Sequence, residues 1–214
     1  MNVCLVLPLK SLRGGKTRLQ AVLREQERAT LIQQLLAHTL GEAARFPGVE
    51  HTVLVSACEE ARTRARTYGV NVLDEPIPGL NHALEHARDW VRARGAEQML
   101  IVPCDLPALS AGDLRCLAQA SSGGAIALSP DRDRRGTNGM CLPTSLALQF
   151  AFGPGSFDRH RAAIERLHLR VVEVERPGLA FDVDTPEDLA QLRGIGWRSP
   201  GSGRRATRCR AEDG

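Results

Sequence analysis

The sequence predicts an α/β protein of a single domain with a wound, mostly parallel sheet. Short apolar segments alternate with stretches of helical periodicity along almost the whole chain, which is the order of a sheet covered by crossover helices. A length of 214 residues with 43% apolar content is also enough for one substantial core. We expect residues 1–194 to form this domain. Residues 195–214 are basic and without periodicity, and we expect a flexible tail there.

Seven short segments have the composition of strands, bounded by polar or turn-forming residues. In chain order they are residues 2–8, 51–56, 70–73, 98–103, 125–129, 138–143 and 170–175. The segment from Gln98 to Pro103 is nearly all apolar, as expected of a strand that is buried on both faces.

Helices are expected between these strands. Residues 25–44 and 80–94 carry apolar side chains at helical spacing, and Trp90 belongs to the second of these patterns, so we expect it in the core rather than against a ligand. Further helices should start at Ser110, Ser156 and Thr185. Thr185 is a good N-cap because Pro186 follows at the first helical position and two acidic residues come next.

The charge balance is mild. Lys and Arg number 28 and Asp and Glu 25, which gives a net charge of +3, and much of the excess lies in the last twenty residues. This is too little to indicate a nucleic-acid partner. The six cysteines form no CxxC pair and are expected to be reduced thiols. The first apolar run is too short to span a membrane and lacks the features of a signal peptide, so we expect a cytoplasmic protein without a membrane partner.

Three carboxylates follow or end apolar runs. Asp105 comes just after the segment 98–103, and open α/β sheets bind their ligands beyond the carboxyl ends of the strands. Asp182 and Asp184 alternate with Val183, so in an extended segment both point to the same side. Three carboxylates that converge at one sheet edge are costly unless a cation lies among them, and oxygen ligands suit Mg²⁺. The sequence therefore predicts a magnesium-dependent enzyme that acts on phosphates.

A basic loop containing glycines follows the first strand. Its backbone N–H groups, together with Lys10, Lys16 and Arg18, could surround a triphosphate. The loop has the spacing of neither a Walker P-loop nor a dinucleotide fingerprint, so an ordinary solvated loop is an equal alternative.

A second anion site is indicated at Ser156, which begins a helix after Gly153 and Gly155. Two anion sites suggest two phosphorylated ligands. Taken alone, Ser156 fits a capping residue better than a ligand, and His160 on the same helix fits a surface residue equally well.

Together these residues closely resemble the 2-phospho-L-lactate guanylyltransferase family, whose members also use phosphoenolpyruvate or 3-phospho-D-glycerate. The resemblance spans about residues 2–194 and rests on an ordered set of motifs: Lys10, Lys16-Thr17-Arg18-Leu19, Gly79-Leu80-Asn81, Asp105-Leu106-Pro107, Gly136-Thr137-Asn138, Phe152-Gly153-Pro154-Gly155-Ser156 with Arg159-His160, and Asp182-Val183-Asp184-Thr185-Pro186.

The resemblance implies a Rossmann-like nucleotidyltransferase fold of the nucleotide-diphospho-sugar transferase type, an α/β/α sandwich. It implies GTP as donor, a small phosphorylated three-carbon carboxylate as acceptor, and a role in making the deazaflavin coenzyme F420. It also implies that Lys10, Thr137, Gly153 and Ser156 hold the phosphate of the acceptor, and that Asp105, Asp182 and Asp184 carry Mg²⁺. A homodimer and hand-over of the product to the next enzyme are compatible with this class.

The expected reaction is attack by the acceptor's phosphate on the α-phosphorus of GTP, with Lys10, Lys16 and Arg18 around the phosphates. His160 or the backbone from Gly153 to Ser156 is expected to pair with the acceptor's carboxylate. Groups at Leu7, Pro8, Leu9, Asn81 and Pro103 are candidates for reading guanine.

The acceptor itself stays open between the three acids. Cys104 and Gly139 depart from the commoner family pattern. If Gly139 makes room beside the acceptor, 3-phospho-D-glycerate is slightly favoured.

Three alternatives remain at this point. A nucleotide-sugar glycosyltransferase also uses an Asp-x-Asp metal motif, although it normally lies mid-chain. A molybdenum-cofactor-type nucleotidyltransferase usually starts with a different glycine-rich loop. A non-catalytic module could bind nucleic acid through its basic tail.

Overall fold

The computed structural model describes residues 2–194 and residue 197. The basic tail predicted for 195–214 therefore lies outside the described residues, apart from Trp197. No helix in the described part of the chain is both long and apolar enough to cross a membrane.

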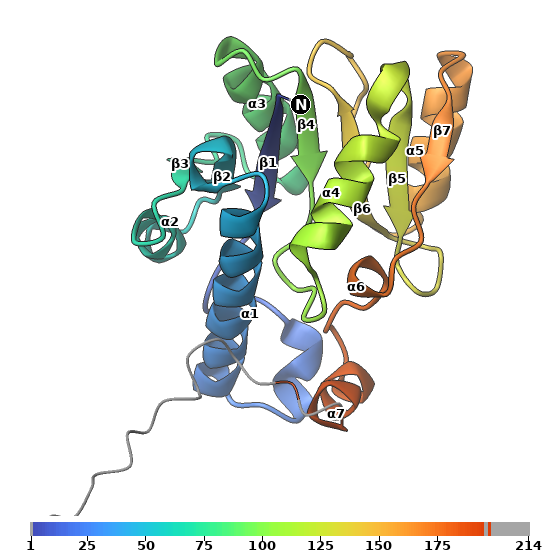
Figure 1. Cartoon of the computed structure of the whole chain (residues 1–214). Helices are drawn as coiled ribbons and strands as arrows, with labels where there is room; N and C mark the ends of the chain where they lie inside the picture. Colours follow the sequence, from blue (N-terminus) through green and yellow to red (C-terminus); the bar gives the residue numbers. More distant parts are fainter. Residues whose placement is uncertain (1, 195–196, 198–214) are drawn as a thin grey trace, which may run out of the picture.

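One seven-stranded sheet forms the centre of the molecule (Figure 1). Its strands lie in the order β3-β2-β1-β4-β6-β5-β7. β6 runs antiparallel to β4 and β5, whereas the other neighbours are parallel. The predicted mostly parallel sheet is thus confirmed. The strand bounds are β1 Val3–Pro8, β2 Thr52–Val55, β3 Asn71–Leu73, β4 Gln98–Ile101, β5 Ile126–Pro130, β6 Thr137–Pro143 and β7 Val171–Glu173.

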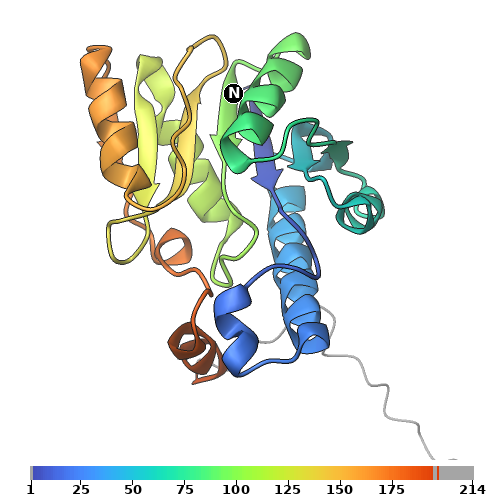
Figure 2. The same ribbon diagram turned by 180° about the vertical axis from the view of Figure 1, so that it is seen from behind.

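Helices cover both faces of the sheet, as the two opposite views show (Figures 1 and 2). The α-helices are α1 Glu25–Arg45, α2 Glu59–Arg66, α3 Leu80–Ala93, α4 Ala111–Ala120, α5 Ser156–Arg166, α6 Pro177–Ala180 and α7 Pro186–Gly194. Short 3₁₀ helices occupy Thr17–Ala21, Val49–His51 and Ser122–Gly124. The expected helix starts at Ser110, Ser156 and Thr185 are confirmed within one residue, and Ser110 caps α4 by accepting from the Asp113 amide.

Alternation along the strands divides the core into two layers. In β1, Leu5 and Leu7 pack with α1 and α4 on one face, whereas Cys4 and Val6 pack with α3 and α5 on the other. Successive side chains of a strand point to opposite faces, so one apolar run supplies both layers. The α/β/α sandwich is the direct result.

A third apolar cluster lies beyond the carboxyl edge of the sheet. It joins the 3₁₀ helix Thr17–Ala21 and the start of α1 to α7, with Leu19, Leu35, Val183 and Leu189 among its buried members. Figure 2 shows the two segments side by side although they come from opposite ends of the chain. This cluster brings the loop after β1 next to the acidic segment before α7.

Candidate active site

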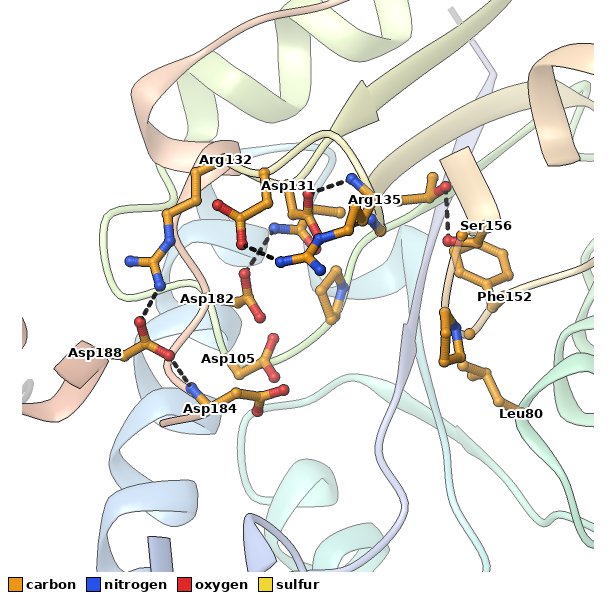
Figure 3. Close-up of a pocket in the computed structure, with 18 of the residues that line it drawn as sticks. Leu80, Asp105, Asp131, Arg132, Arg135, Phe152, Ser156, Asp182, Asp184 and Asp188 are labelled. Carbon is orange, nitrogen blue, oxygen red and sulfur yellow. Dashed lines mark hydrogen bonds and ion pairs between the residues drawn. The ribbon is translucent and has the colours of Figure 1, made fainter. Parts of the chain in front are cut away.

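A cavity of about 550 Å³ opens at the carboxyl edge of the sheet. The ends of β1 and β4 meet the start of β6 there, as expected for a ligand site of an open α/β sheet. Carboxylates gather at one end of the cavity and Ser156 lies at the other (Figure 3). The lining residues are Pro8, Arg18, Leu80, Ile101, Pro103, Asp105, Asp131, Arg132, Asp133, Arg135, Gly136, Thr137, Asn138, Phe152, Gly153, Pro154, Gly155, Ser156, Asp182, Asp184, Thr185 and Asp188.

The acidic end is built by two segments that are far apart in sequence. Val183 is fully buried in the third apolar cluster, and its amide donates to the Asp105 carbonyl at 3.3 Å. Because side chains alternate, burial of Val183 turns Asp182 and Asp184 to the cavity side, where both line the wall with Asp105. The structure therefore brings together the three carboxylates that the sequence predicted to converge.

Lys16 lies among these carboxylates. Its Nζ is 3.1 Å from Asp105 Oδ2 and 3.1 Å from Asp184 Oδ1, and its side chain is only 8% exposed. The backbone of Lys16 is left-handed, with φ of 52°, immediately before the 3₁₀ helix at Thr17. Burial by itself would lower the Lys16 pKa, but the two carboxylates outweigh it and the net shift is upward. Lys16 is therefore a firmly charged ammonium.

The carboxylates have the features of a cation site. Asp105 Oδ1 is buried and has no hydrogen-bond partner. Desolvation, followed by the charge of Asp105, raises the pKa of Asp182 to about 6. Within the described residues, no three His, Cys, Asp or Glu side chains are gathered at metal-ligating geometry. Lys16 lies between two of the carboxylates. The orphaned oxygen and the raised pKa fit a cation-binding role for Asp105 and Asp182.

The opposite end of the cavity is suited to an anion. Ser156 begins α5, and Gly153 (φ 127°) and Gly155 (φ 71°) adopt conformations that favour glycine in the turn before it. The hydroxyls of Thr137 and Ser156 are 3.1 Å apart, and both residues line the cavity. The Ser156 and Phe157 amides already bond the carbonyls of Gly153 and Arg135, so the donors argued for at this helix start are the two hydroxyls.

Other predicted residues lie away from the cavity. Leu7 and Leu9 do not line the cavity, since Leu7 is fully buried in the core and Leu9 packs against that core. Pro8 and Pro103 do line the cavity. Lys10 is exposed on the loop after β1 and is not part of the lining. His160 is fully buried behind Thr137.

The Asn81 side chain is hydrogen-bonded to the backbone of the protein. Its Oδ1 accepts from the Phe152 amide at 2.8 Å, and its Nδ2 donates to the Phe152 carbonyl at 3.3 Å. This pairing ties α3 to the loop that carries Gly153. Asn81 therefore positions the anion end of the cavity.

The expectation of extra room at Gly139 is wrong. A Cβ at this position would lie 2.7 Å from Leu117 Cδ1 and 3.1 Å from Ser129 Cβ, so Gly139 faces α4 rather than the cavity. Cys104 is likewise buried in the core, and desolvation strongly raises its pKa. The argument that favoured 3-phospho-D-glycerate from Gly139 has no structural support.

Several lining residues were not predicted. Arg135 and Asn138 come from the turn before β6 and from β6 itself, and Asn138 Nδ2 lies 3.3 Å from Asp182 Oδ1. Asp188 holds the acidic segment in place, because its Oδ2 accepts from the amides of Asp184 and Thr185. The run of Asp and Arg at 131–135, directly before Gly136-Thr137, is the sequence signal that marks this turn.

The fold is that of the nucleotidyltransferases of the nucleotide-diphospho-sugar transferase type. The structure is similar to a crystal structure from Desulfovibrio desulfuricans G20 named after the nucleotide-diphospho-sugar transferases, with a TM-score of 0.75, 16% sequence identity, and coverage of 96% of this chain and 91% of that chain. A family model described as "Guanylyl transferase CofC like" matches residues 3–198. The chain belongs to this guanylyl transferase family.

Curated relatives agree with this assignment. A phosphoenolpyruvate guanylyltransferase of Rubrobacter xylanophilus is 41% identical over 197 residues, which is 92% of this chain and 96% of the relative. A protein of the same name from Sphaerobacter thermophilus is 40% identical over 194 residues, which is 91% of this chain and 94% of the relative. The family assignment replaces the glycosyltransferase, the molybdenum-cofactor-type and the non-catalytic alternatives.

Proposed function

We propose that this protein transfers GMP from GTP to the phosphate of a small phosphorylated three-carbon carboxylate and releases pyrophosphate, in the biosynthesis of coenzyme F420. The observation that carries the proposal is the division of one cavity into an acidic end and an end that offers hydroxyl groups. Asp105, Asp182 and Asp184 form one end, with Lys16 bonded to two of them, and the hydroxyls of Thr137 in β6 and Ser156 in α5 form the other. This is the arrangement needed for two phosphorylated substrates.

The chain's own residues have two tasks in this reaction. A phosphate monoester has a second pKa of about 6, so the nucleophile is already an anion at neutral pH and no general base is needed. The site must instead hold two polyanions in line and neutralise them. In our proposal Lys16 and Arg18 face the phosphates of GTP, and Thr137, Gly153 and Ser156 hold the phosphate of the acceptor. Pro8 and Pro103, which line the cavity, flank the guanosine in this proposal.

A divalent cation completes the acidic end in this proposal. Asp105, Asp182 and Asp184 would hold it, and Mg²⁺ is the natural choice for carboxylate oxygens. When bound, such an ion polarises phosphoryl oxygens and stabilises the charge that develops on the leaving pyrophosphate.

Phosphoenolpyruvate is the acceptor that we favour. The relatives in the comparison are named for it, and the room at Gly139 that would have favoured 3-phospho-D-glycerate is filled by Leu117 and Ser129. All three family acceptors share a phosphate and a carboxylate, so the anion end of the cavity is compatible with each of them.

The test is incubation with GTP, Mg²⁺ and each acceptor separately, followed by mass analysis of the products. We expect a guanylylated product and stoichiometric pyrophosphate, fastest with phosphoenolpyruvate and lost when the divalent cation is chelated. CTP in place of GTP serves as the donor control. Absence of a guanylylated product with all three acids, or preferential use of CTP, would overturn the proposal.

A further inference from the structure

A chain of hydrogen bonds runs from the backbone of the loop before α5 to the anion end of the cavity. The Ala151 amide donates to His160 Nε2 at 2.9 Å, and His160 Nδ1 lies 3.0 Å from Thr137 Oγ1. Thr137 Oγ1 lies 3.1 Å from Ser156 Oγ. Thr137 and Ser156 line the cavity, whereas His160 is fully buried and packs edge-on against the Phe152 ring. Through hydrogen bonds, His160 therefore reaches a ligand by way of Thr137, and its ring also supports Phe152, which lines the cavity.

The backbone fixes the tautomer of His160. An amide N–H only donates, so Nε2 must be the unprotonated ring nitrogen. In a neutral imidazole the proton is then on Nδ1, and this N–H donates to Thr137 Oγ1. Burial, followed by the charge of Arg159, lowers the pKa of His160 to about 4, so the ring is neutral at pH 7.

The tautomer in turn decides what the hydroxyl pair offers to the cavity. Because Thr137 Oγ1 accepts from His160, the Thr137 and Ser156 hydroxyls use only one of their two protons for the bond between them. The other proton is left for a ligand. With the opposite tautomer, Thr137 would donate to Nδ1, and the pair would have no proton left over once its mutual bond formed.

We propose that His160 is a positioning residue that makes the Thr137–Ser156 hydroxyl pair a hydrogen-bond donor to the phosphate of the acceptor. This inference rests on the proposed function, since it names the ligand group that the pair receives. It assigns no proton transfer to His160. The imidazole orients a hydroxyl and stays neutral throughout.

The kinetic test compares acceptor KM with GTP KM. His160→Leu removes the donor at similar volume and should raise the KM for phosphoenolpyruvate about 10-fold to 100-fold, because a hydrogen bond to a charged group is lost. The GTP KM should change less than about twofold. His160→Asn, which keeps a donor near the Nδ1 position, should recover a large part of the loss. His38→Asn is the matched control, since His38 bonds the Leu109 carbonyl outside the cavity and should leave both constants unchanged.

A double variant separates positioning from general damage. Thr137→Val removes the hydroxyl through which His160 acts. In that background, His160→Leu should add less than about twofold to the acceptor KM, because the two residues work as one unit. Multiplicative effects of the two substitutions would overturn the proposal, as would an equal rise in the GTP KM.

The tautomer is measured directly by long-range ¹H–¹⁵N correlation NMR on histidine-labelled wild-type protein, with His160 assigned by its loss in His160→Asn. The expected signature at pH 7 is a neutral ring with a protonated Nδ1 and a bare Nε2. A protonated Nε2 would sink the inference even if the enzyme is fully active. Conversely, if the wild type guanylylates none of the acceptors, the proposed function is refuted, but the measured tautomer of His160 is still valid.

Discussion

Lys16 donates a hydrogen bond to Asp184, 168 positions further along the chain, with an Nζ–Oδ1 distance of 3.1 Å. The same ammonium lies 3.1 Å from Asp105 Oδ2. One side chain thus neutralises two carboxylates and fastens the loop after β1 to the segment before α7. In our proposal for the reaction, the same charge faces the phosphates of GTP, so Lys16 connects folding with catalysis.

Lys16→Met should therefore lower both the stability of the protein and its rate of GMP transfer. We expect the free energy of unfolding to fall by about 1–3 kcal/mol, because Asp105 and Asp184 lose a common partner while remaining partly solvated. Chemical denaturation at low ionic strength measures this loss, and the rate of GMP transfer should fall at least about 100-fold. Arg13→Met is the control in the same loop. Its pair with Glu60 is exposed and screened by solvent, so the substitution should leave the free energy of unfolding almost unchanged. Equal destabilisation by the two substitutions would contradict this role.

Asp182→Asn should abolish transfer while leaving the fold intact or more stable. Burial raises the pKa of the Asp182 carboxyl to about 6, so its charge opposes folding. The contribution of Asp182 to the free energy of unfolding is greatest below the pKa of the unfolded state, where the carboxyl is protonated in both states. This contribution is lost as the pH rises through about 6 and the buried carboxyl becomes charged. Wild-type stability should therefore carry a decline of about 1–3 kcal/mol between pH 4 and pH 7 that the variant lacks.

Urea denaturation across this pH range measures the difference, with Asp89→Asn on the outer surface of α3 as control, since that carboxylate is exposed. A steeper decline in the Asp182 variant than in wild type would refute the assignment. GMP transfer close to the wild-type rate would remove Asp182 from the cation site.

The strands were predictable because most are short runs of buried apolar side chains, and the partly buried β3 and β7 still contain short apolar pairs. All seven lie within two residues of their expected bounds. The helix α2 was not predicted, since its sequence EEARTRAR buries only Ala61 and Ala65 and so has no apolar stripe. The antiparallel direction of β6 could not be predicted either, because a strand that is buried on both faces has the same apolar pattern whether it runs parallel or antiparallel to its neighbours.

The candidate site was predictable where local signals exist. Asp105 and Asp182 follow or end apolar runs, and Ser156 follows glycines at a helix start. Contacts made by distant polar groups leave no such trace. Asn81 pairs with Phe152 across 71 positions, and His160 is buried although Arg159 and Arg161 flank it. Gly139 looked like space for a ligand, but tertiary packing of Leu117 fills it.

Asn81→Ala should impair the acceptor side of the reaction rather than guanine recognition. Both ends of the Asn81 amide bond the backbone of Phe152, so the substitution releases the loop that precedes Gly153. We expect the acceptor KM to rise about 3-fold to 30-fold, which corresponds to one or two hydrogen bonds, with little change in the ratio of GTP to CTP use. Arg88→Gln offers a contrast on the same helix, because Arg88 bonds the carbonyls of Leu146 and Leu148 further from the cavity. Loss of GTP preference in Asn81→Ala would instead return this residue to the guanine site.

Arg135 is the residue that we expect to pair with the carboxylate of the acceptor. Its backbone is fixed, because its amide donates to Asp131 Oδ1 at 2.8 Å and its carbonyl accepts from the Phe157 amide at 3.3 Å. Its guanidinium lines the cavity and meets the exposed Asp133 at 3.2 Å. His160 is neutral and buried, so it does not supply the positive partner.

Arg135→Gln should therefore raise the acceptor KM about tenfold or more while the GTP KM stays within about threefold. Arg135→Lys should recover only part of the loss, since a lysine lacks the planar fork that binds a carboxylate with two bonds. Phospholactate and phosphoenolpyruvate should suffer alike, whereas an acceptor analogue whose carboxylate is replaced by an amide should be a poor substrate for wild type and insensitive to the substitution. Arg161→Gln, on the outer side of α5 and paired with Asp158, is the control. A rise confined to the GTP KM would place Arg135 at the nucleotide phosphates instead.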